Sequence, residues 1–428
     1  MIMGSTKRLL ISLSSDAAFY GILSGLSKLA SLIIVPIVMR SMSIEEFGRY
    51  DKLLVLFGLL STIAVLGQDS AIATYYFKVE NTNKRGEILL SSLFLQGLAL
   101  TIMFFVYALV NWNAPLDIFI FLVFCVGFVL HNFSRNIFKW IFDKAMFATV
   151  SIGQIIFVLC LVLYFSYDKS ISSTRLLLVI GVSYLLFGGL GFLMLRKRVG
   201  SRIDFRIIRK LLYVGIPLGL VSITGVASKY LERESVLALS DAYTLGIYSA
   251  SLKVILPISL INLALGTSWA PLFFSLTNDI NRSRKYEIVY LLIATIIIVM
   301  QLLLFVFGER LLLLLSGSQY VYEWKILALI ITTAVYDILS GHLQLGAVIS
   351  EKSLGILIAY GISLGIAMLM ILFIPGHDEY TVAFAFLVSS VIRALWIRDL
   401  SNRSGSMSQS LTVTIIPLVI LGYAWFFV

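Results

Sequence analysis

The sequence contains little charge and almost no polar stretch between its apolar segments. Asp, Glu, Lys and Arg make up 13% of the 428 residues, against 59% hydrophobic residues, and the mean hydropathy is +0.98. A soluble domain cannot bury so large an apolar fraction, so lipid must be the solvent for most of the chain. This composition excludes a soluble globular protein.

Cysteine and histidine are too scarce to build a disulfide or a metal site. Cys125 and Cys160 both fall inside apolar segments, and the three histidines do not cluster with them. We therefore expect no disulfide, no bound metal and no cofactor. The N-terminal apolar run is too long for a cleaved signal and lacks a small-residue cleavage site, so we expect a retained membrane segment.

Long apolar segments dominate the rest of the chain. Thirteen of them approach or exceed the length that crosses roughly 30 Å of hydrocarbon as a helix. We expect an all-α integral membrane protein of two six-helix lobes around a central cavity, with twelve core transmembrane helices. Whether the last segment is a thirteenth span or an appendage stays open. The segments are 17–39, 53–77, 87–110, 118–138, 145–166, 174–195, 211–239, 247–275, 288–307, 326–349, 354–374, 381–399 and 411–428.

A basic run at 196–210, RKRVGSRIDFRIIRK, divides these segments into six before it and six or seven after it. We interpret it as a cytoplasmic linker, because topology and anionic lipid headgroups explain its charge without nucleic acid. The sequence therefore predicts an N-terminal six-helix lobe at 1–195, a C-terminal six-helix lobe at 211–400 and an extra hydrophobic segment at 401–428.

The two halves contain similar short motifs between apolar segments. SIEEFGRY at 43–50 and SDAYTLGIY at 240–248 both read Ser, a short polar turn, and then Gly-x-Tyr at the start of the next segment. With the equal helix count, this similarity indicates a duplicated six-helix unit. Because each copy has six spans, an even number, both copies begin on the same side of the membrane, as in parallel repeats.

Basic residues predict the orientation. With a cytoplasmic N-terminus, 21 Lys and Arg residues fall in cytoplasmic segments and seven on the opposite side. The positive-inside rule therefore favours a cytoplasmic N-terminus. The outer connections, of which 40–52 and 308–325 are the largest, are too short to fold as a separate domain.

The segment 211–240 is apolar enough to span a membrane, yet it carries Lys229, Glu232 and Arg233 on one helical face. A charge near the bilayer centre costs roughly 2.5–3.5 kcal/mol, so such groups usually face a bundle interior or a watery cavity. The alternative is that the helix ends near Tyr230 and the charges lie at the membrane surface.

Other ionisable residues lie deep in other segments. Lys28 lies about 18 Å from the boundary at Arg40, too far for its side chain to reach. Basic candidates outnumber acidic ones, which favours a positive cavity and an amphiphile with an anionic headgroup. The alternatives are that Arg135 and Arg393 anchor helix ends and that Asp69 is structural. The candidates are Lys28, Arg233, Lys253 and Lys229 for substrate binding, Asp69, Glu232 and Asp337 for coupling or charge balance, and additionally Arg135, His131 and Arg393.

Four motifs resemble those of one transporter family in their order and spacing. The resemblance covers essentially the whole chain. The chain is similar to the oligosaccharide flippases of the multidrug/oligosaccharidyl-lipid/polysaccharide (MOP) exporter superfamily, in particular the O-antigen and capsule repeat-unit transporters. Glu232 stands before Arg233 where the family often has Asp, and the thirteenth segment is a second departure. The motifs are PIVMRSMSIEEFGRY at 36–50, GQDSAIATYYF at 67–77, YVGIP at 213–217 and LGIYSASLKV at 245–254.

The resemblance implies a V-shaped bundle that alternates between inward and outward openings. The implied cargo is a short oligosaccharide on undecaprenyl pyrophosphate, flipped to the outer leaflet of a bacterial cytoplasmic (inner) membrane for O-antigen or capsule biosynthesis. The implied partners are membrane lipids, a polysaccharide polymerase and a chain-length regulator, with H⁺ or Na⁺ as the coupling ion. By position, the residues that would line the cavity are Lys28, Asp69, Glu232, Arg233 and Lys253.

Two other function classes compete with this interpretation. A drug/cation antiporter of the same superfamily would favour an acidic or neutral aromatic cavity, which the basic excess opposes. A polysaccharide polymerase or ligase also has about a dozen spans but generally carries a large external loop with arginines. We therefore expect a transporter and not an enzyme.

Overall fold

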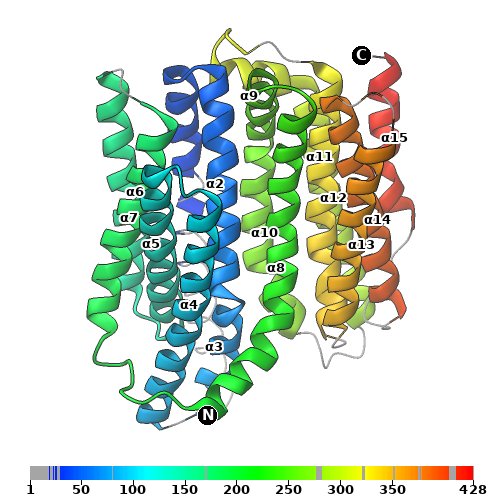
Figure 1. Ribbon diagram of the computed structural model, residues 1–428. Coiled ribbons are helices and arrows are strands. Elements are labelled where there is room, and N and C mark those ends of the chain that lie inside the picture. Colours follow the sequence, from blue (N-terminus) through cyan, green and yellow to red (C-terminus); the bar gives the residue numbers. More distant parts are fainter. Residues whose placement is uncertain are drawn as a thin grey trace. The chain divides into compact units, whose positions relative to one another are not determined.

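The computed structural model describes residues 19, 23, 25, 26, 29–79, 81–168, 171–275, 282–320, 323–349, 352–374, 376, 378–403 and 411–427. Regular structure in these residues is helical throughout, without strands, which confirms the all-α prediction (Figure 1). The helices are α2 (Ile44–Val65), α3 (Gln68–Tyr76), α4 (Thr82–Val110), α5 (Pro115–Trp140), α6 (Lys144–Tyr167), α7 (Ser173–Leu195), α8 (Phe205–Leu239), α9 (Ala242–Ser251), the 3₁₀ segment η1 (Leu252–Ile255), α10 (Leu256–Ser275), α11 (Arg282–Ser316), α12 (Trp324–Ile349), α13 (Ser353–Phe373), α14 (Glu379–Arg403) and α15 (Leu411–Phe427).

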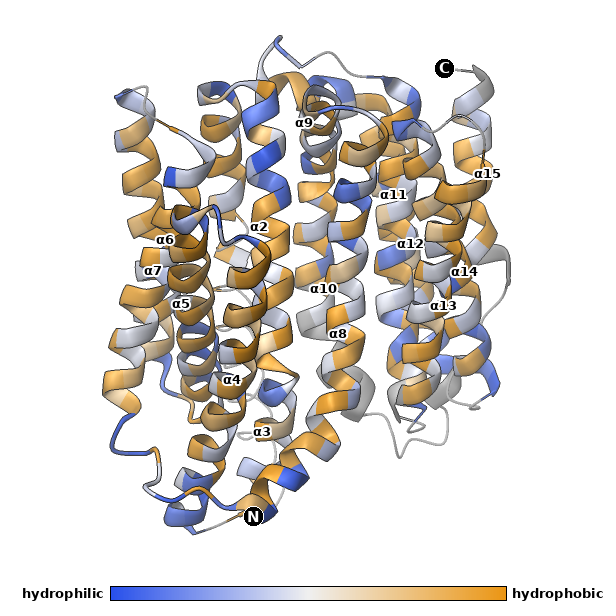
Figure 2. Ribbon diagram, viewed as in Figure 1, coloured by the Kyte–Doolittle hydropathy of each residue, from blue (hydrophilic) through white to orange (hydrophobic). Residues whose placement is uncertain are grey.

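Eleven helices of the described part are long and apolar enough to cross a membrane. Two shorter apolar helices, Leu29–Ser41 and Thr414–Trp425, accompany them. Apolar residues cover most of each helix, and hydrophilic residues gather mainly toward the helix ends (Figure 2). Helices are expected here because lipid offers the backbone no hydrogen-bond partner, so each span must satisfy its own.

Two connections between helices are shorter than the sequence predicted. Residues 40–52 and 308–325 were expected to be loops, but α2 already begins at Ile44 and α11 continues to Ser316. Polar residues at the end of a membrane helix remain helical, since the backbone there still gains by continuing its hydrogen bonds. An apolar segment therefore underestimates the length of its helix.

The chain forms two compact units. The first unit comprises Met1–Gly48 and Leu231–Val428, and the second comprises Arg49–Tyr230. The chain passes from one unit to the other inside α2 and inside α8. The lobe and linker boundaries drawn from the sequence stay a prediction.

In the second unit, α5 and α7 pack closely along their lengths. Glycines allow this approach: a methyl group on Gly127 would lie 2.6 Å from the backbone nitrogen of Leu185, and one on Gly181 would lie 3.0 Å from the Cα of Phe124. Small residues at such contacts let helix backbones come together in a membrane, where packing replaces the hydrophobic effect as the driving force.

The second unit also contains a helix break that packs on a bend. The helix breaks between α2 and α3 at Leu66 and Gly67, whose φ angles are 49° and 66°. This break lies against α8 at Gly215 and Gly219, on either side of Pro217. Pro217 removes one backbone donor from α8, which nevertheless continues past it, so the break between α2 and α3 meets α8 backbone to backbone.

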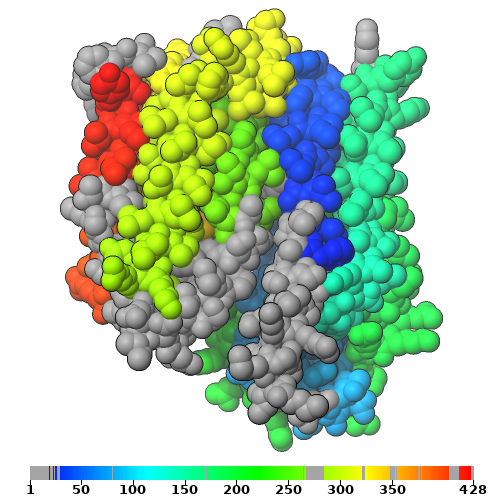
Figure 3. Space-filling model, turned by 180° about the vertical axis from the view of Figure 1, so that it is seen from behind, coloured from blue at the N-terminus to red at the C-terminus, as the bar shows by residue number. Residues whose placement is uncertain are grey.

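In the first unit, α12 is the central helix. It contacts α9, η1, α10, α11, α13, α14 and α15, and the apolar part of Trp324–Ala347 is largely buried. The C-terminal helix α15 packs against α11 and α12, and Figure 3 shows its outer part lying along this unit. Gln301 Nε2 donates to Thr332 Oγ1 (3.1 Å) and to the carbonyl of Pro417 (3.2 Å), so α15 is bound by specific hydrogen bonds.

The similar motifs of the two halves adopt similar local structure. The Ser43 hydroxyl accepts a hydrogen bond from the Glu46 N–H (3.3 Å), and the Asp241 carboxylate accepts one from the Thr244 N–H (2.7 Å). Each bond caps the start of its helix, α2 or α9, three residues after the capping residue. The hydrogen bonds from Thr244 hold the pKa of the exposed Asp241 carboxyl below its usual range. The shared cap supports the internal repeat.

Candidate functional site

Helix α8 carries buried charges close to its C-terminal end. It runs without interruption to Leu239, which excludes a helix end near Tyr230. The side chains of Glu232 and Arg233 lie about one to two turns before that end, and these residues are only 9% and 6% exposed. The sequence-based expectation of buried charge in this helix therefore holds for both residues.

Tyr248 of α9 positions this acid and base. Its hydroxyl donates to Glu232 Oε1 (2.7 Å), and Arg233 Nη1 lies 3.8 Å from Glu232 Oε2. The carboxylate is thus shared between a phenol and a guanidinium, which offsets the cost of burying either charge. Sequence reasoning did not select Tyr248, although it is the Tyr of the Gly-x-Tyr motif and could have been found from it.

Lys253 lies in an irregular part of a membrane helix. Pro257 has no N–H to donate to the Lys253 carbonyl, and the Leu256 N–H takes that carbonyl instead, which tightens η1 to a 3₁₀ turn. The Lys253 ammonium lies 6.0 Å from the centre of the Phe47 ring, within reach of a cation–π interaction. A mid-helix 3₁₀ segment often marks a hinge, and here it carries a half-buried lysine.

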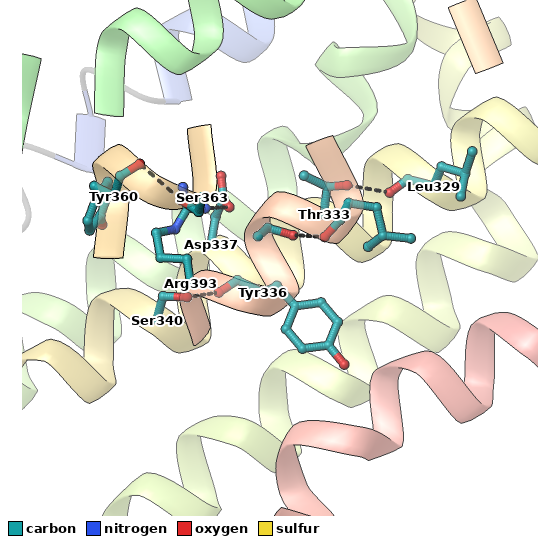
Figure 4. Close-up of polar contacts among 10 residues, drawn as sticks. Leu329, Thr333, Tyr336, Asp337, Ser340, Tyr360, Ser363 and Arg393 are labelled. Atoms are coloured by element: carbon teal, nitrogen blue, oxygen red, sulfur yellow. Dashed lines mark hydrogen bonds and ion pairs between the residues drawn. The ribbon is translucent and has the colours of Figure 1, made fainter. Parts of the chain in front are cut away.

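Asp337 of α12 and Arg393 of α14 form an ion pair in the first unit (Figure 4). The guanidinium also lies 4.8 Å from the ring centre of Tyr360 on α13. The Arg393 side chain is 7% exposed and the Asp337 side chain 43% exposed. At 1.5 Å per residue, Asp337 is roughly 18 Å from either end of α12, so the pair lies far from both helix ends. Asp337 was expected to balance lysines, whereas the structure pairs it with an arginine.

Figure 4 also shows three hydroxyl groups around this pair that bond within their own helices. Thr333 donates to the carbonyl of Leu329 (2.9 Å), and Ser340 and Ser363 donate to those of Tyr336 and Tyr360. These bonds satisfy the hydroxyl groups locally. The ion pair, in contrast, joins α12 to α14.

The second unit contains four of the predicted residues. His131 Nε2 lies 3.3 Å from the carbonyl of Val150, and its ring is 5.1 Å from that of Tyr184. Arg135, one turn further along α5, is half-buried and within electrostatic range of the same tyrosine. This pair forms a polar group around Tyr184.

Asp69 and Lys229 have different surroundings. Asp69 lies in the first turn of α3, where its carboxylate accepts the Ser70 N–H (2.8 Å) and complements the helix dipole. This contact supports a structural role for Asp69. Lys229 is exposed, unlike Glu232 and Arg233.

Lys28 lies outside the described residues. The predicted residues belong to both units, so their grouping in a single cavity stays a prediction. Within the described part of the chain, no three His, Cys, Asp or Glu residues group as metal ligands.

Comparison with known proteins places the chain in a family. The profile of the family described as polysaccharide biosynthesis protein matches residues 13–277. No curated protein sequence matches the chain significantly.

Solved structures resemble the chain over nearly its whole length. An inward-facing multidrug resistance MATE family transporter of the MOP superfamily has a TM-score of 0.65 at 15% identity, covering 90% of this chain and 100% of its own. The lipid II flippase MurJ in an inward closed conformation has a TM-score of 0.66 at 12% identity, covering 96% and 98%. A MOP superfamily transporter from Pyrococcus furiosus, whose binding pocket is described as having reverse polarity, has a TM-score of 0.58 at 15% identity, covering 93% and 96%. The chain therefore has the fold of the MOP superfamily and belongs to the polysaccharide biosynthesis protein family.

Proposed function

We propose that the protein is a flippase for undecaprenyl-pyrophosphate-linked oligosaccharide repeat units. It moves them from the cytoplasmic to the outer leaflet of a bacterial cytoplasmic membrane by alternating access, for O-antigen or capsule biosynthesis. The observation that carries the proposal is the buried Arg233 in a chain of the polysaccharide biosynthesis family. A guanidinium binds phosphate oxygens in a two-pronged geometry that suits a pyrophosphate.

The proposed mechanism is electrostatic capture without bond making or breaking. Arg233 and Lys253 of the first unit attract the pyrophosphate, together with Lys28 and Lys229, while the lipid tail stays in hydrocarbon. Glu232 supports this role, because a buried Arg233 beside an acid needs no ligand to remain stable when the site is empty. The 3₁₀ turn at Lys253 gives its backbone room to adjust as the anion arrives.

Acidic residues balance the charge between turnovers and couple turnover to H⁺ or Na⁺. Asp337 is the best supported of Asp69, Glu232 and Asp337, because its carboxylate is exposed on an otherwise buried helix and contacts Arg393. Protonation of Asp337 would weaken that ion pair. Arg135 and His131 remain further candidates in the second unit.

The proposed setting follows from the cargo. The chain spans the inner membrane with a cytoplasmic N-terminus, and it works beside a polysaccharide polymerase and a chain-length regulator. The basic residues counted on that side support the orientation.

A deletion in the native host tests the proposal directly. The lipid-linked intermediates are extracted and the surface polysaccharide is run on a gel. Loss of surface polymer, with single repeat units accumulating at the cytoplasmic face, is expected for a flippase. Single units that accumulate on the outer face would support a polymerase or ligase instead, and unchanged polymer would overturn the carbohydrate assignment.

A drug/cation antiporter is the second candidate function. The likeness to MATE family transporters favours it, because the inward-facing MATE structure has a TM-score of 0.65, close to the 0.66 of the flippase. A cationic drug would have to approach Arg233 and Lys253, which repel it. Drug susceptibility of the deletion strain separates the two candidates, and an increase without any change in polysaccharide would select the antiporter.

A further inference from the structure

Side chains from the connection between α11 and α12 cap the end of the first helix, Leu29–Ser41. Gln319 Nε2 donates to the backbone carbonyl of Met39 (2.7 Å), and the Tyr320 hydroxyl donates to the same oxygen (3.4 Å). The last carbonyls of a helix lack intrahelical donors, so outside donors stabilise them. Two residues that are distant in sequence therefore hold this helix end.

The capping is reciprocal. Arg40 Nη2 donates to the carbonyl of Leu314 (2.6 Å), in the last turn of α11. That helix ends at Ser316, and Gly317 follows in the left-handed conformation with φ 75°. The C-terminal ends of both helices carry partial negative charge, and the guanidinium of Arg40 offsets the repulsion between them.

The same contact group reaches Lys253 through two aromatic rings. The Tyr320 ring meets the Phe47 ring edge-on at 6.1 Å between centres, and the Lys253 ammonium lies over Phe47. Phe47 is 1% exposed and Tyr320 3% exposed, so the rings are packed on all sides. The contacts from Lys253 to Met39 are thus continuous within the first unit.

These contacts use the less regular parts of the unit. Gln319 and Tyr320 lie in the non-helical connection after α11, and Lys253 lies in the 3₁₀ segment η1. Such segments open at lower free energy than the middle of a long helix. Burial raises the pKa of the Tyr320 phenol, so its hydroxyl remains a donor at physiological pH.

We propose that Arg40, Gln319 and Tyr320 form a latch on the first helix, and that an anionic ligand releases it by drawing Lys253 away from Phe47. The release step rests on the proposed pyrophosphate cargo, whereas the latch does not. A pyrophosphate attracts an ammonium more strongly than an aromatic ring face does, so Lys253 follows the anion and Phe47 loses its cation. Phe47 then no longer holds Tyr320 against the Met39 carbonyl.

A cysteine reporter at Ser316 tests the latch. Ser316 is 1% exposed at the end of α11, while Cys125 is fully buried and Cys160 is exposed. The full chain with Ser316→Cys and Cys160→Ser is reconstituted in liposomes and labelled with a membrane-impermeant maleimide added to each side in turn. This reporter measures how often the latch region opens.

Loss of a latch contact is expected to speed labelling. Gln319→Ala and Arg40→Ala each raise the rate about fivefold, the factor that one net hydrogen bond contributes. Tyr320→Phe removes only the hydroxyl and is expected to give a smaller rise. Because this variant keeps the aromatic ring, a rise in it cannot be attributed to misfolding. Arg310→Ala is the control, because Arg310 is an exposed arginine one turn before Leu314. Unchanged rates in all three latch variants would overturn the latch.

A second arm tests the release step with farnesyl pyrophosphate as the probe and farnesol as the neutral control. Farnesyl pyrophosphate is expected to speed labelling of the reporter protein, and Lys253→Met is expected to abolish that response. An equal response in the Lys253→Met protein would overturn release through Lys253. No response in either protein, with the latch variants behaving as expected, would count against the pyrophosphate cargo and leave the latch intact.

Discussion

Gly48 and Gly246 pack against each other backbone to backbone in the first unit. A methyl group on Gly48 would lie 2.7 Å from the backbone nitrogen of Gly246, and one on Gly246 would clash with the carbonyl of Ile44. These glycines are the equivalent residues of the two Gly-x-Tyr motifs. Mutual contact of equivalent residues is expected where two copies of a repeat meet about a pseudo-twofold axis. This close contact therefore explains why both motifs have glycine at this position.

A larger side chain at this contact should destabilise the protein. Gly246→Val forces the two backbones apart, and overpacking of this kind costs about 1–3 kcal/mol. We expect a lower midpoint in thermal unfolding of the detergent-purified protein. Gly361→Ala is the control, because Gly361 has open space around it and Ala favours the helix. Equal midpoints for Gly246→Val and the parent would show that the contact is loose.

Tyr248→Phe should weaken the charged group on α8. The substitution removes the donor to Glu232, and a hydrogen bond to a charged group contributes about 1.5–3 kcal/mol. We expect lower thermal stability and, if Glu232 positions Arg233 for the cargo, less surface polysaccharide at equal protein level.

The matched control for Tyr248 is Tyr290→Phe. Tyr290 is equally buried, but its hydroxyl has no hydrogen-bond partner among the described residues. We expect this variant to behave like the parent. If both variants lose the same stability, the effect belongs to the loss of any buried hydroxyl and not to the bond with Glu232.

Removal of Asp337 should destabilise the protein more than removal of both partners of its ion pair. Asp337→Asn leaves the buried charge of Arg393 uncompensated, at a cost below the ~3–5 kcal/mol of a fully buried pair because Asp337 is partly exposed. The double variant Asp337→Asn/Arg393→Met should recover part of this loss. A double-mutant cycle in thermal unfolding measures the coupling, and additive effects would show that the pair contributes little.

The positions of the helices could be predicted from the sequence, but their ends could not. A long apolar run must be helical in lipid, so the segments from 53–77 onward correspond to helices of the structure. Ile44 and Ser316 show the limit, because helices continue past the apolar run into polar residues. The break at Leu66 and Gly67 was also missed, since one glycine in an apolar segment does not distinguish a break from a packing contact.

The sequence predicted those parts of the candidate site whose residues are close together in the chain. Glu232 and Arg233 are adjacent, and the apolar residues on both sides favoured their burial over a helix end near Tyr230. Asp337 and Arg393 are 56 residues apart, and Asp337 had several other bases available as partners. The packing of α12 against α14 makes that choice, and packing is not visible in a hydropathy pattern. Tyr248 could have been selected from the Gly-x-Tyr motif, but its bond to Glu232 joins two helices and could not be predicted from the sequence.

The break between α2 and α3 should be intolerant of a side chain. Gly67 has a positive φ, and a methyl group there would clash with the carbonyl of Gly215 and approach the Gly219 nitrogen to 2.7 Å. Gly67→Ala therefore combines left-handed strain with overpacking, and we expect a loss of at least ~1 kcal/mol. Gly97→Ala, in a helix with open space at that glycine, should be neutral or stabilising. A tolerated Gly67→Ala would mean that α8 can move away at this point.

The contact between Gln301 and the C-terminal helix α15 should contribute to the stability of the protein. Gln301→Leu removes the donor to Thr332 and to the Pro417 carbonyl, and that carbonyl then faces an apolar side chain in a buried place. Each lost hydrogen bond costs about 0.5–1.5 kcal/mol, so thermal unfolding should shift downward. Deletion of residues 411–428 should cost more, because it also leaves the Tyr336 hydroxyl without Thr414, its acceptor on α15. A deletion that leaves the unfolding midpoint unchanged would show that α11 and α12 pack fully without α15, which would make the C-terminal helix an appendage after all.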